Sequence, residues 1–171
     1  MRNLAYFFCV LFFSGCMLNY HTGIQKLNEN DLEAAKENFT LALQNDPKNP
    51  QIYFARAMSR GFSDEFSGAI ADLSRAIKLE PNRADFYFYR GYFKSKIANE
   101  KGAILDYSKS IRLNPYLREA YYNRGIKLLN SGFLSEACQD FQQAKDLGDT
   151  LSLRYLHVYC RRELADKNIN D

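Results

Sequence analysis

The stretch that decides the fold is ADFYFYRGYFKSKIANEKGAILDYSKSIRLNP, residues 84–115. Its first part, residues 86–96, places apolar and aromatic side chains at helical spacing, and residues 100–113 repeat that pattern. The residue before Pro115 disfavours the α region, so the second pattern ends there. The stretch therefore predicts two helices joined by a short turn.

This two-helix pattern recurs along the chain with a constant period, which is the spacing from Pro47 to Pro81 and again from Pro81 to Pro115. A fixed period of this length is typical of a solenoid, in which each unit buries its apolar face only against its neighbours. Folds of this kind usually bind other macromolecules and rarely do chemistry. The period is carried by three sets of residues: Pro47, Pro81 and Pro115; Ala35, Ala69, Ala103 and Ala137; and the small residues Gly23, Ala57, Gly91 and Gly125.

The order of residue types inside one unit resembles the tetratricopeptide repeat (TPR). In residues 84–117 the order is Tyr87, Gly91, Ala103, Tyr107, Ser110 and Pro115. The resemblance covers residues 16–151. It implies an all-α, right-handed TPR solenoid of four helix–turn–helix repeats (residues 16–49, 50–83, 84–117 and 118–149), followed by a C-terminal capping helix and tail within residues 150–171.

The capping helix is expected over residues 151–166, because the last repeat would otherwise expose its apolar flank. Its apolar residues are Leu153, Leu156, Tyr159, Cys160 and Leu164. The other face carries Arg154, Arg161, Arg162 and Asp166.

One aromatic position recurs on each first helix, and by resemblance to the family it faces a concave groove. Residues four positions later lie on the same helical face. An exposed groove this apolar is unusual unless it binds something. The alternative is that the rings fill the tight inside of the superhelix. The residues expected to bind a partner are Tyr20, Phe54, Met58, Phe88, Tyr92, Lys96, Tyr122, Ile126 and Asn130.

A charged pair also recurs, with the same spacing between its members each time: Arg56 and Asp72, Arg90 and Asp106, Arg124 and Asp140. The two positions lie nearly symmetrically about the hairpin turn. The first repeat lacks both charges, with Thr22 and Asn38 instead. Joint loss favours a structural ion pair within each hairpin, since an arginine buried without its partner is costly. The alternative is an arginine ladder that holds an acidic ligand.

The first fifteen residues do not belong to the solenoid and are interpreted as a signal peptide. Arg2 is followed by an apolar run over residues 4–13, too short to span a bilayer. Ser14, Gly15 and Cys16 then resemble the lipobox of bacterial lipoproteins, although Phe13 departs from the usual aliphatic residue. The resemblance implies that Cys16 receives a diacylglycerol and becomes the first residue of the mature chain. Ordinary secretion and a cytoplasmic location are the alternatives.

Cys138 and Cys160 remain once Cys9 is removed with the signal peptide and Cys16 carries a lipid. They lie about equally far from the turn near Gly148, on helices that would run antiparallel. An even remainder in an oxidising compartment predicts a disulfide between them. The alternative is two small buried thiols.

The remaining features favour a binding protein over an enzyme. The net charge of +3 is too small to indicate nucleic-acid binding. No catalytic set, phosphate loop, metal site or cofactor motif stands out, and the two histidines, His21 and His157, lie at opposite ends of the repeats. The sequence favours a lipid-anchored module of the bacterial cell envelope, on the periplasmic side or the cell surface, that holds a peptide or helix. The alternative is a structural subunit or assembly factor that docks through its convex face or its ends.

Overall fold

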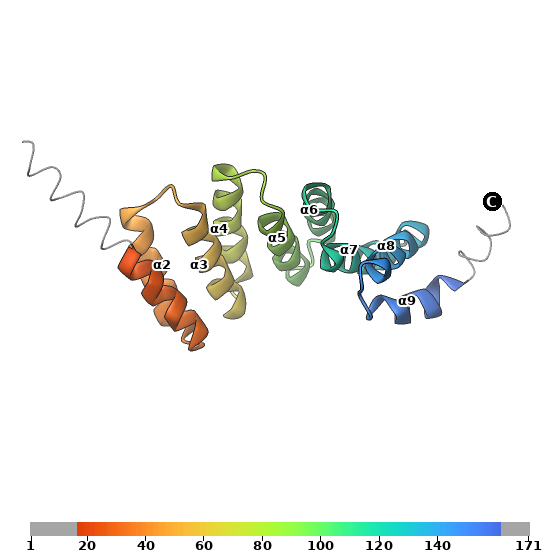
Figure 1. Ribbon diagram of the computed structural model, residues 1–171, viewed down its shortest axis with the longest axis horizontal. Helices are drawn as coiled ribbons and strands as arrows, with labels where there is room; N and C mark the ends of the chain where they lie inside the picture. The colour runs from red at the N-terminus through yellow and green to blue at the C-terminus, as the bar shows by residue number, and fades with distance from the viewer. Residues whose placement is uncertain (1–16, 162–171) are drawn as a thin grey trace, which may run out of the picture. The chain divides into compact units, whose positions relative to one another are not determined.

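The computed structural model describes residues 17–161, which form nine helices and no β-strand (Figure 1). Each helix is followed by a short turn, as the repeat pattern predicts, and the all-α architecture of helical hairpins is confirmed. The helices are a first one over residues 17–28, then α2 (Leu32–Asn45), α3 (Pro50–Phe62), α4 (Phe66–Leu79), α5 (Ala84–Lys96), α6 (Glu100–Leu113), α7 (Arg118–Asn130), α8 (Leu134–Asp146) and α9 (Ser152–Tyr159).

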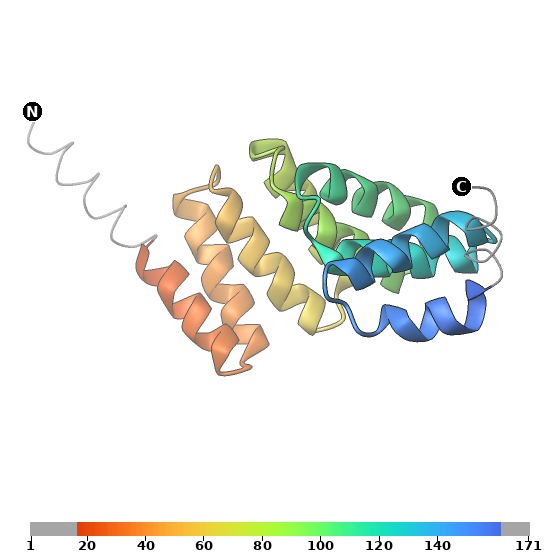
Figure 2. The same ribbon diagram turned by 45° about the vertical axis from the view of Figure 1, so that its right-hand side comes forward.

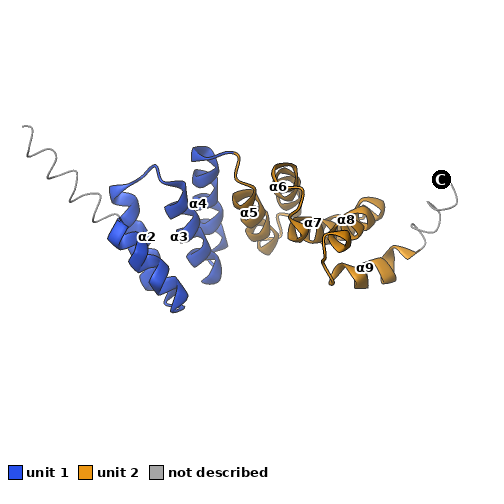
Figure 3. Cartoon of the chain, viewed as in Figure 1, with its two compact units in different colours: residues 1–81 blue, residues 82–171 orange. Residues whose placement is uncertain are grey.

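The chain divides into two compact units, residues 1–81 and 82–171 (Figure 3). Unit 1 holds the first helix and α2 to α4. Unit 2 holds α5 to α9, in which α6 packs on both α5 and α7, and α8 on α7. The last helix, α9, lies against α8 (Figure 2).

The second helix of each proline-containing repeat ends just before the proline. The residue there leaves the helical conformation: Asp46, Glu80 and Asn114 have φ between −135° and −139°. Asp31 and Asn99 begin second helices, because their side chains accept the backbone N–H of Ala34 and Gly102. Local sequence therefore determines where these helices start and stop.

The turn inside each hairpin contains one residue with positive φ. The values are 60° at Asn30, 59° at Asp64, 57° at Ala98 and 85° at Gly132, and these positions keep the period of the repeats. Glycine, asparagine and aspartate adopt this left-handed conformation most readily. Ala98 is the exception among the four.

The small residue of each first helix faces a large residue of the second helix, at the same spacing along the chain in every hairpin. A Cβ atom added to Gly23 would lie 2.6 Å from the ring of Phe39. One added to Gly125 would lie 2.9 Å from the ring of Phe141. Where the opposing residue is the smaller Leu73, the chain carries Ala57 instead. The size of the opposing side chain thus decides between glycine and alanine.

The capping helix differs from the sequence expectation in its buried face. It spans Ser152–Tyr159, its start is in register with the helix starts at Pro50, Ala84 and Arg118, and the expected end near residue 166 lies outside the described residues. Ser152, Leu156 and Cys160 are buried, one helical turn apart. Leu153 and Tyr159 were expected on the apolar face, yet they are 51% and 50% exposed.

Candidate functional site

The half-buried groove residues predicted in unit 2 lie on α5 and α7: Phe88, Tyr92, Tyr122 and Ile126. We call these four residues the stripe of unit 2. The ring of Phe88 lies 5.9 Å from the ring of Tyr107, and that of Tyr122 lies 6.3 Å from Phe141. Each ring thus contacts its own hairpin's core while part of it stays exposed. The two sequence interpretations, packing and partner binding, therefore apply to the same side chains.

The polar residues expected at the end of the stripe are exposed. The ammonium group of Lys96 lies 5.1 Å from the centre of the Tyr92 ring, within cation–π range. Asn130 lies at the C-terminal end of α7 and is also exposed. These groups are available to a partner that contacts the stripe.

The remaining predicted groove residues, Tyr20, Phe54 and Met58, lie in unit 1 and are half-buried there. The ring of Tyr20 lies 6.0 Å from Phe39, which repeats the Phe88–Tyr107 contact. A single groove through all four repeats stays a prediction, because its residues belong to two separately described units.

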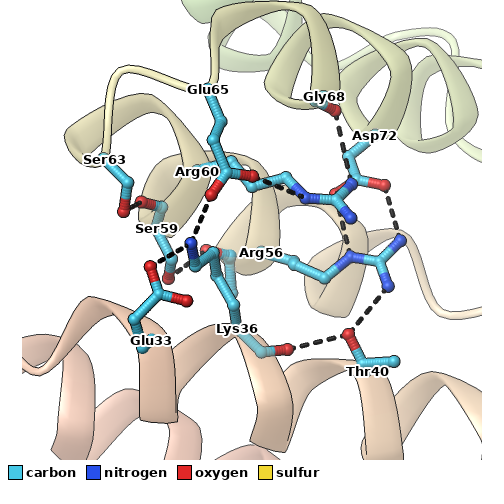
Figure 4. A network of polar contacts seen from close by, with 11 residues as sticks. Glu33, Lys36, Thr40, Arg56, Ser59, Arg60, Ser63, Glu65, Gly68 and Asp72 are labelled. Atoms are coloured by element: carbon cyan, nitrogen blue, oxygen red, sulfur yellow. Dashed lines mark hydrogen bonds and ion pairs between the residues drawn. The ribbon is translucent and has the colours of Figure 1, made fainter.

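In unit 1 the predicted Arg–Asp pair is part of a larger network (Figure 4). The Nε and Nη2 groups of Arg56 donate to the two carboxylate oxygens of Asp72, at 2.9 and 2.7 Å. Its Nη1 group donates to the hydroxyl of Thr40 on α2, at 3.1 Å. Arg60 adds a second cation 2.6 Å from Asp72. The guanidinium of Arg56 therefore links two consecutive repeats.

A second part of this network joins Lys36 on α2 to Glu33 and Glu65 (Figure 4). Hydrogen bonds to Glu33 and Glu65 raise the pKa of Lys36, and the hydrogen bond from Lys36 lowers the pKa of Glu65. The first two repeats are thus joined by the Lys36–Glu65 ion pair as well as by the Arg56–Thr40 hydrogen bond.

Unit 2 repeats the arrangement. Arg90 donates to both oxygens of Asp106 at 2.8 and 2.7 Å, and Arg124 does the same to Asp140. The Nη1 group of Arg124 also donates to the hydroxyl of Ser108 on α6, at 2.9 Å. Burial raises the pKa of Asp140, while the hydrogen bonds from Arg124 oppose that shift.

These contacts occupy donors that an acidic ligand would need, which favours the structural interpretation of the arginines over a ligand-binding ladder. Sequence reasoning paired each arginine with its aspartate but missed the hydroxyl of the preceding repeat. The signal was present, because Thr40 and Ser108 stand as far before Arg56 and Arg124 as the two aspartates stand after them.

Cys138 on α8 and Cys160 at the end of α9 are joined by a disulfide, with their Cα atoms 5.6 Å apart. Both are buried in a cluster with Phe141 and Leu156. The ring of Tyr155 stacks on Phe141 at 4.6 Å. Aromatic packing and the disulfide together fix α9 on α8.

Tyr122 connects this cluster to the stripe of unit 2. Its ring lies 5.8 Å from that of Tyr155. Burial, followed by hydrogen bonding to Tyr155, raises the pKa of Tyr122 to about 12. The hydroxyl therefore stays protonated at neutral pH.

The predicted lipidation residue, Cys16, lies outside the described residues, as do the signal segment and residues 162–171. The first described helix starts at once after it, with Met17 and Leu18 exposed. Among residues 17–161, no helix is both long and apolar enough to cross a bilayer. In the same range, no three histidine, cysteine, aspartate or glutamate side chains gather as a metal site would require.

Several solved structures resemble this chain. MamA residues 41-end from Desulfovibrio magneticus RS-1 superpose with a TM-score of 0.81 at 18% identity, covering 90% of this chain and 88% of that one. The TPR protein YrrB, described as having an unusual peptide-binding site, gives 0.70 at 21% identity over 76% and 67%. The first TPR of Spaghetti (RPAP3), bound to the HSP90 peptide SRMEEVD, gives 0.68 at 20% identity over 70% and 94%.

No protein-family model matches the chain, and no curated protein matches it by sequence. The sequence identities to these three structures are low, so the superpositions show a shared fold and do not indicate a shared partner. The chain has helical hairpins at a constant period, with small residues at the contact inside each hairpin. Together with these superpositions, this shows that the chain has the tetratricopeptide repeat fold.

Proposed function

We propose that the protein is a protein–protein interaction module that binds a peptide or helix through the first helices of its repeats. The observation that carries the proposal is the stripe of unit 2. Phe88 and Tyr122 contact the core with one part of the ring and stay exposed with the other. Aromatic residues of this kind supply most of the binding energy in many protein interfaces.

Two similar structures support this role. YrrB is described as a TPR protein with a peptide-binding site, and the RPAP3 repeat is described with a bound peptide. A peptide held in this way would find apolar rings beside the ammonium group of Lys96 and the amide of Asn130.

The test uses Tyr92, because its ring contacts only Phe93 of its own helix and Lys96 among the ring and cation contacts described. Tyr92→Ala should therefore keep the fold and weaken the capture of the partner in a crosslinking pulldown from membranes about tenfold or more. The control is Leu105→Ala on α6, where the leucine is 70% exposed on a second helix. Equal capture by wild type and Tyr92→Ala, at equal thermal stability, would contradict binding through the first helices.

The same pair of variants addresses the second candidate function, a structural subunit or assembly factor that docks through its second helices. Leu105 favours this candidate, because a leucine so exposed is apolar surface without cover among the described residues. Loss of the partner with Leu105→Ala and its retention with Tyr92→Ala would support docking through that surface.

We further propose that the module is anchored in a bacterial envelope membrane by lipid on Cys16. The Leu4–Cys16 pattern motivates the proposal. It is supported by the disulfide, since such bonds persist in oxidising compartments, and by Met17 and Leu18, which are exposed directly after the cysteine.

Metabolic labelling with a clickable fatty acid tests the anchor. Cys16→Ser should lose the label and move from the membrane fraction to the soluble fraction. Cys9→Ser is the matched control and should keep both properties. Unchanged membrane association of Cys16→Ser would contradict the lipoprotein proposal.

A further inference from the structure

Unit 2 contains a cavity of about 390 Å³ beside the stripe. It lies between the first turns of α7 and the turn that joins α8 to α9, and we call it the α7–α9 cavity. Its volume falls within the range of ligand pockets, about 300–1,000 Å³. Its lining comprises Arg118, Glu119, Tyr122, Asn123, Gly148, Asp149, Thr150 and Leu151.

Both carboxylates of this lining already have partners within the protein. Arg118 donates to the carboxylate of Glu119 at 3.1 Å. The carboxylate of Asp149 accepts the backbone N–H of Leu151 at 2.7 Å and the hydroxyl of Ser152 at 3.1 Å. A cationic ligand would have to compete with these bonds for the carboxylates, so the cavity favours an uncharged side chain over a cationic one.

The lining also offers apolar surface and an acceptor. Tyr122 is half-buried, and Leu151 is 63% exposed although it is a large aliphatic residue. The NH₂ group of Asn123 donates to the carbonyl of Glu119 at 2.7 Å. Its amide oxygen accepts no hydrogen bond from the described residues, which leaves an acceptor for a ligand N–H or O–H group.

We propose that the α7–α9 cavity is a side-chain pocket for an aromatic residue that carries a hydrogen-bond donor, tryptophan above all, in a bound peptide. The ring packs against Tyr122 and Leu151, and its N–H group donates to Asn123. The proposal deepens the proposed function and rests on it, because Tyr122 belongs to both the stripe and the cavity. It adds a preference for one residue type at one place in the peptide.

A titration of the full chain with N-acetyltryptophanamide tests the pocket without any knowledge of the partner. The chain contains no tryptophan, so indole fluorescence reports the probe alone. The expected result is saturable binding with a Kd in the millimolar range, about what one side chain supplies. The backbone amide resonances of Gly148 and Thr150 should shift with the same Kd. Binding that leaves both resonances unmoved would overturn the proposal.

Two comparisons separate the parts of the argument. N-acetylphenylalaninamide lacks the donor and should bind about fivefold more weakly, the equivalent of one hydrogen bond. Leu151→Ser should weaken the indole probe about fivefold as well. Leu153→Ser is the matched control, since Leu153 is also half-exposed on α9 but does not line the cavity, and it should bind as wild type does. Equal effects of the two serine variants, or tighter binding of N-acetyllysinamide, would overturn the pocket.

A failure of the pocket proposal can be distinguished from a failure of the proposed function. If Tyr92→Ala keeps the natural partner while the indole probe still binds in the cavity, the proposed function is wrong and the pocket stands alone. If Tyr92→Ala loses the partner and the probe does not bind, the pocket is wrong and the stripe remains the binding surface.

Discussion

At the scale of single residues, Ala98 holds a backbone conformation that its side chain disfavours. Its φ of 57° lies in the left-handed region, at the place where the other hairpins have Asn30, Asp64 or Gly132. The left-handed conformation costs an ordinary L-residue about 1–2 kcal/mol. Its side chain is exposed and buries nothing in return. The turn between α5 and α6 is therefore less stable than its counterparts.

Ala98→Gly should raise the free energy of unfolding by about 1 kcal/mol, because glycine adopts positive φ without a steric penalty. Gly132→Ala, at the equivalent turn between α7 and α8, should lower it by a similar amount. No atoms lie within 4 Å of a Cβ built on Gly132, so the backbone alone is tested. Urea unfolding measures both changes. A destabilising effect of Ala98→Gly would contradict the conclusion that Ala98 holds an unfavourable backbone conformation.

At the scale of helices, the three Arg–Asp pairs differ in how many cations surround each carboxylate. Asp72 contacts Arg56 and Arg60, and Asp106 contacts Arg90 and Lys94. Asp140 pairs with a single cation, Arg124, among the described residues, and its side chain is only 5% exposed. In the last hairpin a single arginine therefore neutralises the buried carboxylate, whereas in the other two hairpins two cations do so.

Arg124→Ala should lower the free energy of unfolding by about 3 kcal/mol, because it leaves a buried carboxylate without a counter-ion. Arg90→Ala should cost less, about 1.5 kcal/mol, since Lys94 still lies 2.8 Å from Asp106. The double variant Arg124→Ala/Asp140→Asn should cost less than the sum of its single changes. Thermal and urea unfolding of the set give the comparison, and strictly additive losses would show that the two residues do not interact.

Most helix boundaries could be predicted from the sequence, because prolines, capping residues and the repeat period act locally. The buried face of α9 could not, although its start keeps the period. In α3 and α5 the third residue, Ile52 or Phe86, is buried, but α9 has the exposed Arg154 at that place. Which face packs depends on the disulfide and on Tyr155, which are tertiary contacts. The α7–α9 cavity escaped prediction for the same reason.

At the scale of the whole molecule, the disulfide fixes the short helix α9 to the rest of unit 2. The bond joins two cysteines with a sequence separation of 22, and the segment between them includes the Gly148–Leu151 wall of the cavity. A loop of this length corresponds to about 3 kcal/mol of stabilisation in the chain-entropy model. Stability of unit 2 and the shape of the cavity are therefore linked.

The double variant Cys138→Ser/Cys160→Ser should lower the free energy of unfolding by about 3 kcal/mol. It should also weaken the binding of N-acetyltryptophanamide, because the turn that forms one wall is no longer fixed. Mass spectrometry of non-reduced protein recovered from cells checks the premise. Two free thiols there would contradict it, as would unfolding curves that are the same with and without reductant.

The glycine-to-ring contact found in three of the four hairpins limits the order in which mutation can exchange its two residues. Alanine at position 23 would clash with the ring of Phe39, since a Cβ atom added to Gly23 would lie 2.6 Å from it. A hairpin with glycine and leucine would hold only a void, which a protein tolerates at a moderate cost. Between the pairing of glycine with a ring and that of alanine with leucine, only one order of mutation therefore avoids a clash. If the pairing of Ala57 with Leu73 arose from one of glycine with a ring, Leu73 came first and Ala57 later filled the space that it left.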